Sequence, residues 1–193
     1  SAQMMEEHPS RDYLAQIHKQ LGRLTHLEEA LLLLSRLDAG ILPLKMEAVD
    51  VYTAVSLAAD NLQEVFEAAG LSVDIPEMGE MKILADLDWT MEALMNLFKN
   101  CAEYTPPGGR IHCACSQNPL YTEIILWDEG KGFDKEDIPH LFERFYRGKN
   151  ASGNGIGIGL SLAREIIERQ NGTIRAVNLP GKGAAFEIRF YSH

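Results

Sequence analysis

Long apolar runs are missing from this sequence of 193 residues. The longest obvious one extends from Ala30 to Leu34, far short of the roughly 20 residues that a membrane-spanning helix needs. The first residues do not resemble a secretory signal peptide. They read S-A-Q-M-M without an initiator methionine, so we expect a piece excised from a longer protein.

Positive charge is also scarce. The chain has 18 Lys and Arg against 28 Asp and Glu, which gives a formal net charge of −10 and leaves no basic stripe. This balance argues against nucleic acid as the main ligand. An acidic protein that binds a nucleotide would need a divalent cation to neutralise the phosphates locally.

Cysteine is rare and its count is odd, since the chain has only Cys101, Cys113 and Cys115. Free thiols in a reducing compartment are therefore expected. The tetrapeptide His112-Cys113-Ala114-Cys115 invites a zinc interpretation. However, a strand over 110–117 places the two cysteines on one face and His112 on the other, and no second ligand pair with zinc spacing exists.

Glycine, by contrast, is concentrated in one place. Residues 153–160 read G-N-G-I-G-I-G-L and lead directly into an expected helix. Alternating glycines leave backbone N–H groups uncovered, and the positive end of a helix dipole follows them. This combination suits a polyanion such as a nucleoside triphosphate, although a flexible lid or a glycine hinge remains an alternative.

The glycine segment matches neither of the two best-known nucleotide motifs. A Walker loop requires Ser or Thr after Gly-Lys, and here Lys149 is followed by Asn150 and Lys182 by Gly183. A Rossmann loop counted from Gly155 would need a glycine or alanine where Leu160 stands. A third kind of site is needed.

The hydrophobic pattern divides the chain into two parts. Leucines and isoleucines recur every three or four residues over 11–39, which predicts one long amphipathic helix of a bundle. Such a helix cannot bury its apolar stripe alone. From about Val49 the pattern is mixed, with helices expected at 51–69, 89–104 and 160–170 and strands at 71–75, 82–85, 110–117, 121–127, 173–178 and 184–191. Asp88 is expected to cap the second of these helices. Antiparallel strands with helices on one face make a two-layer α/β sandwich.

Two asparagines occupy the middle of the second of these helices. Asn96 and Asn100 are four residues apart, so they project from the same face. Asparagine is a poor helix former. A solvated polar face is one explanation, and a neutral oxygen ligand for Mg²⁺ is the other.

An acidic residue stands at the end of the apolar strand 121–127. Asp128 is followed by Glu129-Gly130-Lys131-Gly132. Its carboxylate could accept a hydrogen bond from an exocyclic amine, and the glycines could let a flat base lie against the backbone. A solvated acidic turn is equally compatible with this composition. A calcium loop fits poorly, because its invariant glycine would fall on Phe133.

Five segments together resemble the conserved boxes of sensor histidine kinases. They are N-L-F-K-N-C-A-E-Y-T-P (96–106), D-E-G-K-G-F (128–133), L-F-E-R-F-Y-R-G (141–148), G-I-G-I-G-L (155–160) and G-K-G-A-A-F (181–186), in the family's order. The resemblance implies a catalytic ATP-binding domain of the histidine-kinase and gyrase (Bergerat) type at 45–193. Residues 1–44 resemble part of the dimerisation and phosphoacceptor hairpin, with its second helix at 11–39.

The resemblance also implies roles for individual residues. Asn100 would hold Mg²⁺, and Asp128 would bind the adenine amine. Phe142 and Phe145 would anchor a lid at 148–155. The implied ATP-binding residues are Asn96, Asn100, Tyr104, Asp128, Gly130, Gly132, Tyr146, Arg147, Gly155, Ile156, Gly157, Ile158, Gly159 and Leu160.

The sequence departs from the family pattern at three points. Glu103 stands where many members have Lys or Arg, and Ala184 stands where Thr is common. The third departure is the H box, since neither His8, His18 nor His26 lies in a motif like H-E-[LIM]-[KR]-[TNS]-P. The phosphoacceptor histidine, and with it any catalytic residue, is therefore expected on a first hairpin helix outside this sequence.

The resemblance implies phosphoryl transfer from ATP to that histidine and then to an aspartate of a response regulator. A second kinase protomer would pair through the helix at 11–39. The chain would be a cytoplasmic portion of a membrane-anchored protein, attached only through upstream segments. Two alternatives are a degenerate nucleotide-binding regulatory module and an ATPase of the gyrase and MutL kind.

Overall fold

The computed structural model describes residues 8–149 and 157–192. The chain divides into two compact units, residues 1–42 and 43–193. The first unit is the helix α1 (His8–Asp38). It ends at Gly40, whose φ of +67° is easily adopted only by glycine. No helix in the described ranges is long and apolar enough to span a membrane.

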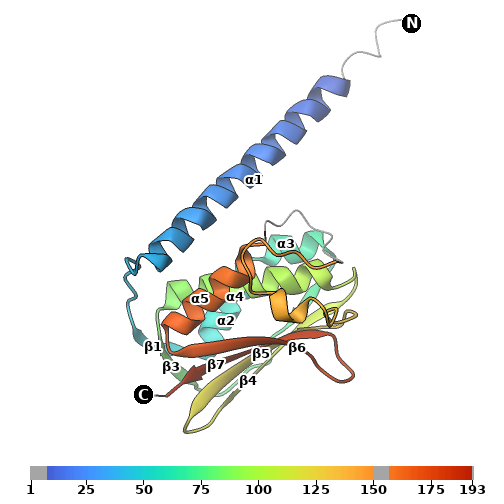
Figure 1. Ribbon diagram of the computed structural model, residues 1–193. Coiled ribbons are helices and arrows are strands. Elements are labelled where there is room, and N and C mark those ends of the chain that lie inside the picture. The colour runs from blue at the N-terminus through green and yellow to red at the C-terminus, as the bar shows by residue number, and fades with distance from the viewer. Residues whose placement is uncertain (1–7, 150–156, 193) are drawn as a thin grey trace, which may run out of the picture. The chain divides into compact units, whose positions relative to one another are not determined.

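The second unit has two layers, a five-stranded sheet and a layer of helices. The sheet has the order β2-β4-β5-β7-β6, and α2, α4 and α5 cover one of its faces (Figure 1). The strands are β2 (Ser72–Asp74), β4 (Arg110–Gln117), β5 (Tyr121–Asp128), β6 (Gly172–Asn178) and β7 (Ala184–Tyr191), and the helices are α2 (Val51–Asp60), α3 (Gln63–Ala68), α4 (Leu87–Tyr104) and α5 (Gly159–Arg169). The two-layer fold expected from the sequence is confirmed.

Alternation along the strands explains why the helices cover only one face. On β5, Thr122, Ile124, Leu126 and Asp128 are buried, while the residues between them are partly exposed. This alternation of buried and partly exposed residues is typical of an antiparallel sheet that packs on one side only, because successive side chains point to opposite faces. The same alternation on β4 buries Cys113, whereas His112 stacks on Trp127 at a ring distance of 5.1 Å.

Three local predictions were wrong. The helix expected at 51–69 breaks between α2 and α3, and a short two-stranded sheet of β1 (Glu47–Asp50) and β3 (Lys82–Ala85) was partly missed. The edge strand β2 pairs parallel with β4, so the sheet is not wholly antiparallel. The break in the helix is hard to predict because Leu62 and Phe66 on its far side are also buried, so apolar spacing continues across it.

The start of α4 was also assigned to the wrong residue. Asp86, not Asp88, caps the helix, and its Oδ1 accepts a hydrogen bond from the backbone N–H of Trp89 at 3.0 Å. Asp86 itself donates its backbone N–H to Oε1 of Gln170 at 2.6 Å. Gln170 is 2% exposed and also donates to Thr90 Oγ1. This buried network fixes the start of α4 to the end of α5, the two helices that flank the candidate site.

Candidate nucleotide-binding site

Asp128 lies at the end of β5, where the strand's alternation turns its side chain toward the helix layer. It is 1% exposed, and its Oδ1 accepts hydrogen bonds from the backbone N–H groups of Gly130 at 2.8 Å and Ala184 at 3.2 Å. Burial raises the pKa of this carboxyl above its ordinary value of 3.8, while the two N–H donors oppose the rise. Because both of these hydrogen bonds use Oδ1, Oδ2 can accept a hydrogen bond from a ligand's amine.

Two glycines form a cradle around Asp128. A Cβ built on Gly183 would lie 2.2 Å from Asp128 Oδ1 and 2.6 Å from its backbone oxygen, and one on Gly130 would lie 2.7 Å from the backbone oxygen of Tyr104. No side chain fits at either position without displacing backbone. The glycines therefore bring three segments that are far apart in the sequence into direct backbone contact at Asp128.

The loop after β5 is held from the opposite edge of the sheet. Asn178, at the end of β6, accepts the backbone N–H of Phe133 at 2.7 Å and donates to its backbone oxygen at 2.8 Å. Gly132 has a φ of +87° and approaches Asn178 so closely that a Cβ would lie 2.7 Å from Oδ1. Asn178 thus fixes the shape of the Gly130–Gly132 loop. Its role could not be predicted from the sequence, because an asparagine at the end of a strand is typical of any turn.

Three polar side chains follow one face of α4 at intervals of four residues. Asn96, Asn100 and Tyr104 lie along this face. Oδ1 of Asn100 is buried and has no hydrogen-bond partner among the described residues. A buried acceptor without a partner is costly, and a cation would satisfy it. The amide oxygen of Asn100 therefore fits a Mg²⁺ ligand.

The other end of this face meets the start of α5. A Cβ on Gly159 would lie 3.0 Å from Oδ1 of Asn96, so the backbone of α5 begins directly against that amide. Gly157 has a φ of +81°, and its carbonyl accepts the N–H of Phe145 at 2.7 Å. The N-terminal end of a helix is favourable for anions. The structure thus brings Gly159 to the asparagine face, while Gly157 lies against the backbone of Phe145 and Tyr146.

Of the remaining predicted residues of the glycine segment, the structure describes two and leaves two outside its described ranges. Ile158 is 3% exposed and Leu160 is partly buried, so both side chains pack inward while their backbones line the start of α5. Gly155 and Ile156, and most of the lid predicted at 148–155, lie outside the described residues.

Asp137 anchors the segment that precedes the glycines. It is 5% exposed, and its Oδ1 accepts the hydroxyl of Tyr146 at 2.6 Å while Oδ2 accepts the N–H of Lys149 at 3.2 Å. The bond to Asp137 raises the pKa of Tyr146 to about 12. Sequence reasoning missed Asp137, and its only signal is its position just before the L-F-E-R-F-Y-R-G segment. The tyrosine predicted to reach the nucleotide is held by this carboxylate.

Glu103, one of the two residues that depart from the family pattern, has a cationic partner. Glu103 Oε1 accepts a hydrogen bond from the guanidinium of Arg147 at 3.1 Å. Burial is the largest cause that raises the pKa of the neighbouring Tyr104, followed by Glu103 and Asp137. Glu103 thus holds an arginine against α4, at a position where many family members carry a cation on the helix itself.

The two phenylalanines predicted to anchor the lid differ. Phe142 packs edge-on against Phe186 at a ring distance of 6.4 Å, with the guanidinium of Arg164 5.7 Å from its ring centre. Phe145 is 57% exposed and has a φ of +68°, which is strained for a residue with a side chain. Phe142 is therefore half-buried against Phe186, whereas Phe145 presents its ring on the surface.

A glycine-to-alanine series is expected to test the cradle. Gly183→Ala should lower the free energy of unfolding by about 2–4 kcal/mol and abolish nucleotide binding, because the new methyl group collides with Asp128. The matched control Gly79→Ala has nothing within 4 Å and should change stability by less than about 0.5 kcal/mol. Urea unfolding and nucleotide titration measure both. A Gly183→Ala protein that binds nucleotide normally would contradict the cradle.

The model of the histidine kinase-, DNA gyrase B- and HSP90-like ATPase family matches residues 85–192. The sensor protein SphS of Synechococcus elongatus is 34% identical over 176 residues, covering 85% of this chain and 42% of that protein. The signal transduction histidine-protein kinase BaeS of Escherichia coli is 29% identical over 178 residues, covering 91% of this chain and 38% of that protein. The chain thus spans about two fifths of the length of these relatives.

Solved structures show the same fold. The full-length structure of ShkA in complex with AMPPNP matches with a TM-score of 0.76 at 20% identity, over 94% of this chain and 39% of that one. The histidine kinase ThkA in complex with the response regulator protein TrrA matches with a TM-score of 0.74 at 17% identity, over 97% and 53%. The chain therefore belongs to the family of histidine kinase-, DNA gyrase B- and HSP90-like ATPases, and within it to the sensor histidine kinases.

Proposed function

We propose that this chain binds MgATP and donates the γ-phosphoryl group to a histidine of a hairpin helix outside this sequence, for onward transfer to an aspartate of a response regulator. One observation carries the proposal. The buried acceptor Asp128 and the unpartnered amide oxygen of Asn100 lie beside a single face of α4, whose other end meets the start of α5.

The residues fit the parts of ATP in order along that face. Asp128 Oδ2 would accept the adenine amine, and the Gly130–Gly132 backbone would lie against the flat base. Asn100 would hold Mg²⁺ with Asn96 beside it, and the backbone of 157–160 would face the phosphates. ATP supplies the transferred group, and Mg²⁺ neutralises charge on its phosphates. The chain contributes positioning and fixed dipoles, and the proposal requires no nucleophile from it.

The first unit supports a partner role for α1. Six apolar side chains on this helix are 41–61% exposed, namely Leu14, Ile17, Leu21, Leu24, Leu31 and Leu32. A stripe of this length is stable only when covered. We infer that it packs in a hairpin bundle with a second kinase protomer. The complex of ThkA with TrrA supports a response regulator as the onward partner, and the relatives support a cytoplasmic portion of a membrane-anchored kinase.

Reconstitution in trans tests the function. The chain is mixed with a separately produced hairpin helix that contains an H-E-[LIM]-[KR]-[TNS]-P motif and with ATP labelled in its γ-phosphate. We expect acid-labile, base-stable label on the histidine of that helix, and no label when the histidine is replaced by glutamine. Tight ATP binding without labelled histidine would support the regulatory module instead. Hydrolysis that is independent of the helix would support an ATPase of the gyrase kind.

A further inference from the structure

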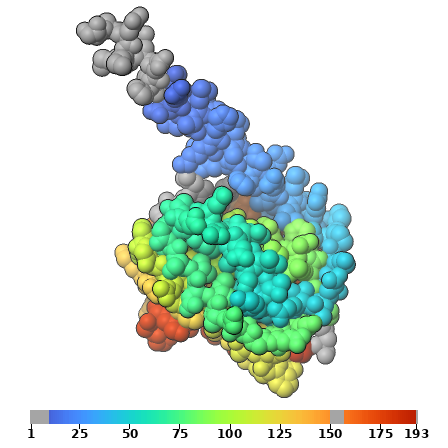
Figure 2. All heavy atoms as spheres, turned by 180° about the vertical axis from the view of Figure 1, so that it is seen from behind, coloured from blue at the N-terminus to red at the C-terminus, as the bar shows by residue number. Residues whose placement is uncertain are grey.

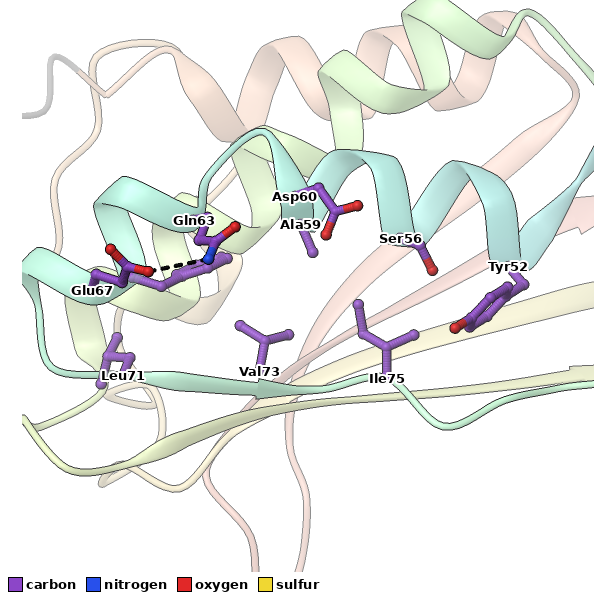
Figure 3. A pocket seen from close by; sticks show the side chains of 10 residues that line it. Tyr52, Ser56, Ala59, Asp60, Gln63, Glu67, Leu71, Val73 and Ile75 are labelled. Carbon is purple, nitrogen blue, oxygen red and sulfur yellow. Dashed lines mark hydrogen bonds between the residues drawn. The ribbon is translucent and has the colours of Figure 1, made fainter.

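A groove separate from the nucleotide site lies between α2, α3 and the edge strand β2. Its volume is about 460 Å³. Its apolar wall consists of Ala59, Phe66, Leu71, Val73 and Ile75. In Figure 3, Val73 and Ile75 point from the β2 segment toward α2, while Tyr52, Ser56 and Asp60 lie along the helix above them. The groove is large enough for several side chains of a ligand.

The strand beside this groove has an unpaired edge. β2 is the first strand in the sheet order, so only β4 pairs with it. The N–H of Ser72 donates to Gly109 on the β4 side at 3.3 Å. Because successive peptide groups of a strand alternate in direction, the N–H and C=O of Val73 point away from β4. Such an edge can accept a further strand.

The charge around the groove has one sign. Residues 46–81 contain eight acidic residues and no Lys, Arg or His. Several of these acids have a local role: Asp50 caps α2, and Glu80 pairs with Lys82. On α2 and α3, by contrast, Asp60, Glu64 and Glu67 form no ion pair with a cation in the described ranges, and Glu67 only accepts a bond from Gln63 at 3.1 Å.

We propose that this groove docks an extended basic segment of a partner protein, which adds to the free edge of β2 and places apolar side chains in the groove and Lys or Arg side chains beside Asp60 and Glu67. The three observations are complementary, since backbone pairing, an apolar wall and an anionic rim all suit one kind of ligand. A second copy of this chain fits poorly, because it carries a net charge of −10. The turquoise atoms of α2 and α3 face the viewer in Figure 2, on open surface.

The test uses the 193-residue chain and a capped heptapeptide in which Lys or Arg alternates with Val. Fluorescence anisotropy should show saturable binding that weakens with salt. Asp60→Lys/Glu67→Lys should weaken it about tenfold or more. Glu28→Lys/Glu29→Lys on α1 makes the same change in net charge at residues that do not line the groove, and it should leave the affinity within about twofold. Equal weakening by both pairs would overturn the proposal, because it would indicate attraction by net charge alone.

A second variant tests strand addition. Val73→Pro removes the outward N–H, and an edge strand tolerates proline at a position whose N–H faces solvent. We expect about tenfold weaker peptide binding with unchanged circular dichroism and unchanged ATP affinity. Peptide binding that is unaffected by Val73→Pro, or dimerisation through this groove in analytical ultracentrifugation, would overturn the proposal. Because ATP binding is measured separately, failure here is distinguishable from failure of the kinase function.

Discussion

Asn100→Ala is expected to reduce phosphoryl transfer to the supplied histidine helix by about 100-fold or more. The reason is that Oδ1 of Asn100 is the one buried amide oxygen without a partner among the described residues, and it lies on the α4 face between Asn96 and Tyr104. Removing it would deprive the proposed Mg²⁺ of the protein ligand that we assign to it. Initial rates of histidine labelling at saturating ATP measure the effect.

Two controls separate a metal role from a structural one. Oδ1 of Asn100 accepts no hydrogen bond from the residues that the structure describes, so Asn100→Ala should change the free energy of unfolding by less than about 1 kcal/mol. ATP affinity should fall in the presence of Mg²⁺ and stay the same in its absence. An equal loss of affinity with and without Mg²⁺ would show that Asn100 contacts the nucleotide directly and that the metal assignment is wrong.

Much of the fold was predictable because its signals are local. Apolar alternation predicted β4, β5, β6 and β7 almost to the residue, and the apolar spacing over 11–39 predicted the end of α1 to within one residue. The break after α2 and the parallel pairing of β2 were not predictable, because both depend on packing between segments. The cap of α4 was misplaced by two residues because Asp86 and Asp88 are equally good capping residues, and only the buried bond from Asp86 to Gln170 decides between them.

The candidate site shows the same division. Residue type and spacing pointed to Asn96, Asn100 and Asp128, and five motifs in order pointed to the family. By contrast, no local sequence pattern identified the residues that hold the loops of the site from distant positions in the chain. Asn178 and Asp137 hold the loops of the site through bonds that span 45 and 12 residues of sequence. Gly183 was visible as part of a motif, but the reason for it, its contact with Asp128, is a property of the folded backbone.

Asp128→Asn is expected to abolish nucleotide binding while it stabilises the free protein. An asparagine can keep the bonds from Gly130 and Ala184 through Oδ1, but it presents an NH₂ group where the adenine amine needs an acceptor. Because the NH₂ group of the asparagine and the adenine amine are both donors, they cannot bond to each other, and ATP affinity should fall by about 100-fold or more. Isothermal titration with ATP measures the loss.

The effect on stability depends on pH with a definite sign. Burial raises the pKa of Asp128 above 3.8, so at neutral pH the folded chain holds a charge that burial disfavours. Asp128→Asn removes this charge, and the variant should be more stable than the parent above the folded pKa. The advantage should shrink as the pH falls through that value and vanish below 3.8, where the carboxyl is neutral in both states. Urea unfolding between pH 3 and 8 measures it.

A matched variant shows what an ordinary carboxylate does on the same helix layer. Asp88 is exposed in the first turn of α4, and its carboxylate accepts no hydrogen bond from another described residue. Asp88→Asn should therefore leave ATP affinity within about twofold and lower stability slightly by removing a favourable charge near the helix start. Opposite signs for the two variants are therefore expected at pH 7. If Asp128→Asn also lowered stability at pH 7, the buried carboxylate would be stabilising the fold. That result would contradict our expectation that Asp128 serves nucleotide binding and destabilises the free protein.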